Sequence, residues 1–150
     1  MTHKILLEGK VAIITDGASG IGATTVRIFV ENGAEVVIAD IQDEQGEEIS
    51  TNLGENAHYI HDDVSKEDDV KNPIDAKFSR FGHLDIMYNN AGVYDVTIKS
   101  ILDTKADDLE RMCKNLAVEL GLHGIRVNCI SPFAISSSSK VDDEIVARFE

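Results

Sequence analysis

The sequence predicts an α/β fold built on a doubly wound parallel sheet of about five strands, within a single domain. Short apolar runs alternate with longer amphipathic stretches along the 150 residues, a pattern typical of strands joined by helices. A glycine-rich turn, TDGASGIG, follows the first apolar run, and polar loops follow later ones. We expect these loops to meet at the carboxyl edge of the sheet, where such folds bind ligands.

The first half of the chain contains three predicted strands and two predicted helices. The run at 11–14 is apolar throughout, as in strands that are buried on both faces. Residues 20–32 repeat apolar side chains at helical spacing and stop before Gly33, a residue that commonly ends helices. The other elements expected here are a strand at 34–39, a polar helix at 42–53 and a strand at 58–60.

The second half contains a helix that we expect to begin with Ser65 as its cap and to be interrupted by Pro73. A proline inside a helix costs about 3 kcal/mol, so we expect a kink there or a restart with Asn72 as the new cap. The remaining elements expected are a strand at 84–88, a long helix at 102–120 and a fifth strand at 125–130.

Composition excludes several classes of partner. The formal net charge of −13 repels phosphate backbones and anionic membranes, so we expect neither a nucleic acid nor a membrane as partner. Apolar runs all fall short of the roughly 20 residues that span a bilayer. Cys113 and Cys129 are the only cysteines. Two cysteines suggest no disulfide framework, and we therefore expect a cytoplasmic protein.

The glycine-rich turn and an acid after the next strand together indicate a dinucleotide site. Gly20 and Gly22 open the first helix, whose free N–H groups can bind a pyrophosphate. Asp40 lies 18 residues past Gly22, at the end of the second strand. A carboxylate at that place accepts both hydroxyls of the adenosine ribose and repels a 2′-phosphate, which favours NAD over NADP.

The chain resembles the short-chain dehydrogenases/reductases, especially the plant branch of secoisolariciresinol dehydrogenase-like enzymes. The matching stretches are GKVAIITDGASGIG, AEVVIAD, DDV at 62–64, LDIMYNNAG and KNLAVELGLHGIRVNCISP, which cover almost the whole chain. The resemblance implies a Rossmann-like NAD-binding domain over 1–150 and hydride transfer between NAD(H) and a secondary alcohol or ketone.

The glycine loop and the resemblance together give ten candidate cofactor contacts, for which ordinary loop and turn chemistry is the alternative explanation. They are Ser19, Gly20, Ile21, Gly22, Asp40, Asp63, Val64, Asn90, Ala91 and Gly92.

One departure from the family pattern lies in the glycine loop. Asp16 replaces the first glycine of the family's TGxxxGxG pattern. We expect its carboxylate to lie near the pyrophosphate, where like charges cost on the order of 1–2 kcal/mol, or roughly tenfold in affinity. NAD binding is therefore expected to be weak.

A second departure removes the catalytic groups. The family uses a Ser together with a Tyr and a Lys spaced YxxxK, and none of the three tyrosines here has that spacing. Tyr94 and Lys99 are five residues apart and precede the long helix, where the family has no catalytic pair. An internal deletion between 112 and 113 accounts for the loss, because the flanking residues resemble the start of one family helix and the end of the next. The sequence therefore predicts no catalytic residue.

The two sides of the deletion still fit one helix, because their apolar residues form one stripe at spacings of four and three. The strand at 125–130 is then expected to pair beside 84–88, and the competing outcome is an exposed sheet edge that aggregates. The stripe consists of Leu102, Ala106, Leu109, Cys113, Leu116 and Leu120.

Three hypotheses for function stay open at this point. The first is an oxidoreductase acting on a small secondary alcohol or ketone, with activity lost or severely reduced. The second is a non-catalytic module that holds NAD(H) weakly or forms homo- or hetero-oligomers with family members. The third is a truncated product without a stable fold.

His58 and His61 lie near two aspartates, but their spacing at a strand end is more typical of a solvated loop than of a metal site. We therefore expect no metal site.

Overall fold

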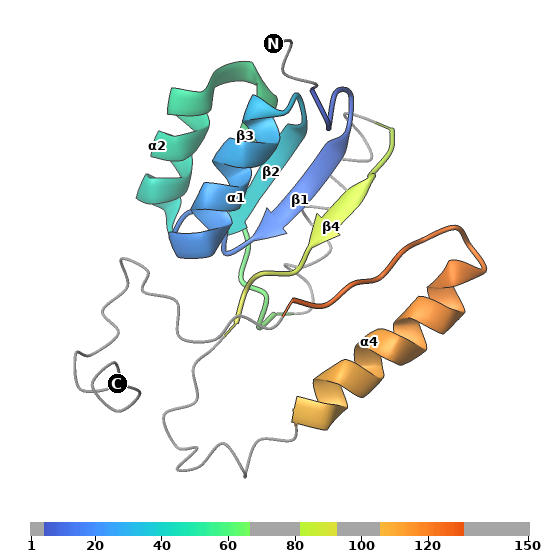
Figure 1. Cartoon of the computed structure of the whole chain (residues 1–150). Helices are drawn as coiled ribbons and strands as arrows, with labels where there is room; N and C mark the ends of the chain where they lie inside the picture. Colours follow the sequence, from blue (N-terminus) through green and yellow to red (C-terminus); the bar gives the residue numbers. More distant parts are fainter. Residues whose placement is uncertain (1–4, 67–81, 93–105, 131–150) are drawn as a thin grey trace, which may run out of the picture. The chain divides into compact units, whose positions relative to one another are not determined.

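The structure is a computed structural model that describes residues 5–66, 82–92 and 106–130. The chain forms two compact units, which are described separately here. The first unit comprises 1–92 with 137–140 and contains the sheet, whereas the second comprises 93–136 with 141–150 and contains a long helix (Figure 1). The assignment of all 150 residues to one domain stays a prediction.

Four parallel strands form the sheet within the described residues, in the order β3-β2-β1-β4. Their bounds are Val11–Thr15 for β1, Glu35–Asp40 for β2, Ala57–His61 for β3 and Ile86–Tyr88 for β4. Because β1 has β2 on one side and β4 on the other, the strand order reverses at β1. Such a reversal is the point at which open α/β sheets bind ligands. The predicted α/β class with a parallel sheet is confirmed.

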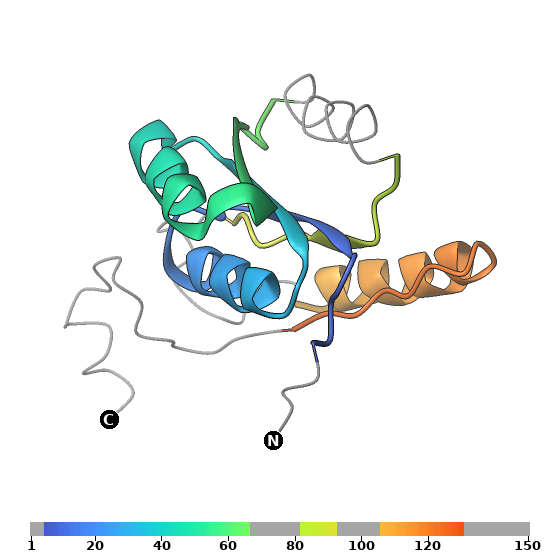
Figure 2. The same cartoon turned by 90° about the horizontal axis from the view of Figure 1, so that it is seen from above.

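Two helices cover one face of this sheet. They are α1, Gly20–Glu31, and α2, Asp43–Leu53, and they lie side by side in both views (Figures 1 and 2). Each helix contributes apolar side chains to the core beneath it, which stabilises both helices far more than their own propensity does. The buried members of this core are Ala12, Ile14, Ala18, Ala23, Val26, Ala34, Val36, Ile38, Ile49 and Ala57.

The opposite face of the sheet is also buried. Successive side chains of a strand point to opposite faces, and Ile13, Val37 and Ala39 are each at most 1% exposed on this second face. Burial on both faces explains why β1 and β2 are apolar without alternation. The helix expected between Ser65 and the residues beyond Pro73 falls mostly outside the described residues.

The predicted strands and the first two predicted helices of the first unit agree with the structure to within two residues at each end. The strand expected at 125–130 is wrong, because these residues form no strand. Its apolar composition suits a strand, but a strand also needs a partner edge that supplies hydrogen bonds. Within the described part of the chain, β4 has β1 as its strand neighbour.

A single helix in the second unit spans the inferred deletion point. Helix α4, Ala106–Gly121, crosses residues 112 and 113 without a break, which confirms the prediction of one continuous helix. Cys113, Leu116 and Leu120 are half-buried, as expected for members of the apolar stripe, whereas Leu102 lies outside the described residues. Neither α4 nor another described helix is both long and apolar enough to cross a membrane.

Both cysteines of the second unit are free thiols. Burial raises the pKa of the Cys113 thiol, and the neighbouring Cys129 thiol raises that pKa further. Because the thiolate is the reactive form of cysteine, a raised pKa makes Cys113 a weak nucleophile at neutral pH.

We predict that Gly46→Ala destabilises the protein although alanine is the better helix former. A Cβ at Gly46 would lie 2.1 to 2.9 Å from ring atoms of Tyr59, whose hydroxyl is held by hydrogen bonds on β2 and α2. Overpacking of this kind costs about 1–3 kcal/mol, against a gain in helix propensity of about 1 kcal/mol.

Urea denaturation of the variant should show a lower free energy of unfolding than wild type. Gln45→Ala, at an exposed position of the same helix, is the matched control and should be close to neutral. A Gly46→Ala variant as stable as this control would show that the Tyr59 ring can move aside.

Candidate functional site

Thr15 joins the two loops that follow the central strands. Its buried Oγ1 accepts hydrogen bonds from the backbone N–H of Asn90 at 3.0 Å and of Ala91 at 2.9 Å. These bonds hold the NNAG segment against the end of β1. The sequence did not indicate Thr15 as a site residue, because its two partners lie about 75 residues away along the chain.

The glycine loop is a tight turn that requires Gly22. A Cβ at Gly22 would lie 2.0 Å from the carbonyl oxygen of Asp16 and 2.9 Å from Nδ2 of Asn90. The Nδ2 group of Asn90 also donates to that carbonyl oxygen at 3.3 Å. Asp16 itself has a φ of +51°, in the left-handed region where Gly is the usual residue and where Asp is tolerated better than most. Gly22 is therefore required for the fold of the loop itself, independently of any bound ligand.

The first turn of α1 begins directly after the loop that follows β1. The N-cap residue, Ser19, makes no side-chain capping bond, and its Oγ instead lies 3.5 Å from Oδ1 of Asp16. The N–H groups at the start of a helix have no partner within the helix, and they bind anions well. The predicted contacts Gly20, Ile21 and Gly22 supply these groups, and Ile21 is 37% exposed.

Asp40 links the glycine loop to the end of β2. Its side chain is buried, and its Oδ2 accepts the Ala18 N–H at 2.8 Å. Its Oδ1 accepts the backbone N–H of Gln42 at 3.0 Å and the Gln42 side-chain amide at 3.3 Å. A carboxylate oxygen can accept more than one hydrogen bond. Asp40 can therefore still accept a ribose hydroxyl, which fits the role predicted for it.

Asp16 and Asp40 form a pair of carboxyl groups at this edge. Thr15 is opposite Ala39 in the β1–β2 register, so the next residue of each chain segment is an aspartate. Burial raises the pKa of Asp16, and the neighbouring Asp40 carboxyl raises it further, against a smaller opposite effect of the Ser19 hydroxyl.

The expected position of the Asp16 carboxylate near a pyrophosphate stays a prediction, and the structure adds Asp40 as a neighbour that the sequence did not indicate. The reason is the parallel register of β1 and β2, which the loop motif alone does not reveal.

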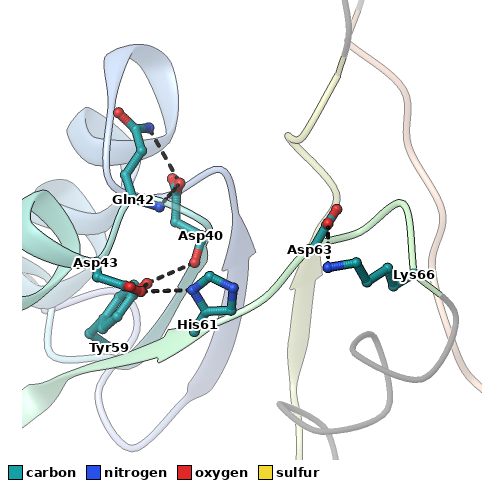
Figure 3. Close-up of polar contacts among 7 residues, drawn as sticks. All are labelled: Asp40, Gln42, Asp43, Tyr59, His61, Asp63 and Lys66. Carbon is teal, nitrogen blue, oxygen red and sulfur yellow. Dashed lines mark hydrogen bonds and ion pairs between the residues drawn. The ribbon is translucent and has the colours of Figure 1, made fainter.

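A second network braces β2, β3 and α2 beside Asp40 (Figure 3). The Tyr59 hydroxyl donates to the Asp40 carbonyl oxygen at 2.8 Å and to Oδ1 of Asp43 at 2.5 Å, and His61 Nδ1 lies 2.7 Å from the same Oδ1. Burial, and then the Asp43 carboxylate, raise the pKa of Tyr59. The Tyr59 hydroxyl, and then His61, lower the pKa of Asp43. A tyrosine whose pKa is raised stays protonated at neutral pH and gives up its proton less readily.

Asp63 and Val64 follow β3 and make local contacts. Oδ1 of Asp63 accepts the Ser65 N–H at 3.1 Å and the Ser65 hydroxyl at 2.6 Å, and the Lys66 ammonium lies 3.1 Å from its Oδ2 (Figure 3). The Ser65 hydroxyl and Lys66 lower the pKa of Asp63 to about 2. None of these described contacts joins Asp63 to the glycine loop. Val64 is 48% exposed, and Gly92 has open space around its Cα.

His58 and His61 do not belong to a recognisable metal site. Among the described residues, no group of three or more His, Cys, Asp or Glu side chains has the arrangement that could hold a metal ion. His61 is instead part of the Asp43 network.

Comparisons with known proteins agree with the architecture of this site. A family model described as short chain dehydrogenase matches residues 10–114. The chain is 41% identical to a (21S)-21-acetoxyl-apo-melianone synthase SDR from Melia azedarach, over 93% of this chain and 73% of that protein. It is 38% identical to secoisolariciresinol dehydrogenase from Forsythia intermedia, over 88% of this chain and 68% of that protein.

A solved structure is also similar. The crystal structure of a 3-ketoacyl-(acyl-carrier-protein) reductase from Brucella melitensis complexed with NADH aligns with a TM-score of 0.58 and 32% sequence identity. The alignment covers 79% of this chain and 54% of the reductase chain. This chain therefore spans about half the length of the reductase.

The alignment to the Melia protein supports an internal deletion. It extends over 198 positions, whereas this chain has 150 residues, a difference of 48. At least that many positions of the relative, inside the aligned span, therefore have no counterpart here.

We predict that Thr15→Val lowers the free energy of unfolding by about 1–3 kcal/mol. Valine keeps the shape of threonine but leaves the part-buried N–H groups of Asn90 and Ala91 without their acceptor. The loss of two hydrogen bonds of about 0.5–1.5 kcal/mol each accounts for this range. Thr15→Ser keeps the acceptor and serves as the control.

Hydrogen exchange at Asn90 and Ala91 should be faster in Thr15→Val than in Thr15→Ser. Equal exchange in the two variants would show that the hydroxyl does not hold the NNAG segment.

Proposed function

The chain belongs to the short-chain dehydrogenase family, and we propose that it binds NAD(H) at the carboxyl edge of its sheet with little or no turnover. The observation that carries the binding proposal is the glycine loop fastened to Asp40 through the Ala18 N–H. When bound, the cofactor supplies the nicotinamide that exchanges hydride with an alcohol or ketone. We place this function in the cytoplasm because both cysteines are free.

Each part of the cofactor has a proposed partner in the chain. The first-turn N–H groups of α1, from Gly20 to Gly22, would receive the pyrophosphate. Asp40 would accept the hydroxyls of the adenosine ribose. Val64 offers an exposed apolar side chain for the adenine ring, and Asp63 lies beside it. The NNAG segment, which Thr15 holds at the end of β1, would lie beside the cofactor.

The proposed loss of turnover rests on the spacing of the tyrosines in the sequence. The YxxxK pair of the family has no counterpart in the sequence. Tyr59 is engaged with Asp40 and Asp43, and its pKa is raised rather than lowered. Loss of a general acid/base alone reduces rates by about 10²–10⁴. Loss of the lysine that positions the cofactor reduces them further.

Pairing with another copy or with an intact family member is a second candidate function. Exposed apolar side chains in the second unit favour it, since Val118, Leu122 and Ile130 are 78%, 87% and 77% exposed. Light scattering after size exclusion, with the protein alone and mixed with an intact relative, tests this candidate. A monomer mass in both samples would exclude it.

We expect no turnover above background when pure protein is incubated with NAD and a panel of secondary alcohols, including polycyclic plant-type alcohols. Formation of NADH, followed by its absorbance, is the measurement. Tyr94→Phe and Lys99→Ala are the control variants, because these residues are the nearest approach to the family pair. Ordinary rates that either variant abolishes would contradict the proposal and assign catalysis to that pair.

We predict that Asp40→Ala lowers the preference for NAD over NADP. The variant removes the carboxylate that would repel a 2′-phosphate, so the ratio of the two dissociation constants should approach one. Titration of both cofactors measures the ratio, and Asp43→Asn, which changes a neighbouring acid outside the glycine loop, is the control. An unchanged ratio in Asp40→Ala would exclude Asp40 from the ribose role.

We also predict that Asp16→Gly tightens NAD binding at neutral pH by roughly tenfold, because it removes a like charge from the site. Glycine adopts the φ of +51° at this position without strain. Tighter binding by the wild-type protein in the same titration would contradict this prediction.

A further inference from the structure

We propose that NAD binding is coupled to the uptake of one proton by Asp16, so that the neutral carboxyl of Asp16 is the form that accepts the cofactor. This inference rests on the proposed NAD(H) function and adds a regulation of that site by pH. Asp16 stands where the family loop has a glycine. Because glycine has no titratable group, a loop with the family residue would lack this coupling.

The geometry brings two acids to one place at the end of adjacent parallel strands. Thr15 and Ala39 are partners in the register, and neighbouring strands are about 4.8 Å apart. Asp16 and Asp40 are the next residues along their segments. The Ala18 N–H bond to Asp40 then folds the loop that carries Asp16 back onto the end of β2.

The groups around Asp16 favour its neutral form. From β2, the buried Asp40 carboxyl faces it and disfavours the charged form of Asp16. From the start of α1, the Ser19 hydroxyl stabilises the charged form, and this effect is smaller. The Asn90 amide after β4 contacts the Asp16 backbone carbonyl rather than its carboxyl. Among the described residues, the charged group that acts on Asp16 is therefore another acid.

A bound dinucleotide would favour the neutral form of Asp16 over the charged form still more. The pyrophosphate adds negative charge at the start of α1, and the adenosine removes water from the two carboxyl groups. Both changes disfavour the charged form of Asp16. Linkage then requires affinity to rise as pH falls, by at most tenfold per pH unit for one proton.

The direct test measures NAD dissociation constants from about pH 8 to about pH 5 for wild type, Asp16→Asn and Asp16→Gly. Asparagine keeps the size of the side chain and tolerates the left-handed region, and glycine restores the family residue. We expect binding by wild type to tighten by up to about tenfold per pH unit over part of this range, and binding by both variants to change little. Any titration of NAD itself affects all three proteins equally, so the difference between wild type and the variants does not contain it.

Calorimetry gives a second readout that needs no variant. NAD binding to wild type near neutral pH, measured in two buffers of different ionisation enthalpy, should reveal net proton uptake of up to one per cofactor. Zero uptake, together with equal pH slopes for all three proteins, would overturn the inference and leave the binding proposal intact. Failure of all three proteins to bind NAD at any pH would overturn both.

The protein without cofactor supplies a third readout. The folded-state pKa of Asp16 is raised, so the stability linked to its proton is present in acid and is lost as pH rises through that pKa. Asp16→Asn should therefore gain thermal stability over wild type as pH rises toward neutrality. A constant difference between the two melting temperatures across the pH range would contradict a raised pKa at Asp16.

Discussion

The hydrogen bond from the Ala18 amide to the Asp40 carboxylate is the interaction on which the geometry of the site depends. It is buried, and it joins the loop after β1 to the end of β2. The same aspartate binds the Gln42 amide at the start of α2, and its carbonyl accepts the Tyr59 hydroxyl of β3. One residue thus ties together the loop after β1, the start of α2 and strand β3.

Much of the sheet was predictable because its strands are buried on both faces and are therefore apolar without interruption. β1 and β2 are examples, and the glycine turn between β1 and α1 marked the reversal of the chain. The position of Asp40 at the end of β2 was predictable as well, because one helix and one strand of ordinary length separate it from the glycine loop along the chain. The continuity of α4 across 112 and 113 followed from the spacing of its apolar residues.

The remaining features depend on contacts that sequence patterns do not specify. Residues 125–130 have the composition of a strand but no strand conformation, because a strand needs a partner and composition does not name one. The neighbour of Asp16 depends on the register between two strands, which the loop pattern does not contain. Thr15 escaped selection because its role, to accept two N–H groups from a loop 75 residues away, exists only in the folded chain.

An intact family member combines cofactor binding with catalysis, and we propose that this chain keeps only cofactor binding, since its sequence has the glycine loop and Asp40 but no YxxxK pair. The central claim is that the folded chain still recognises NAD. A thermal melt with increasing NAD tests this most directly, because a ligand that binds only the folded state raises the melting temperature with its concentration. The account predicts a rise that is smaller with NADP. A melting temperature unchanged at millimolar NAD, or a chain without a cooperative transition, would contradict it.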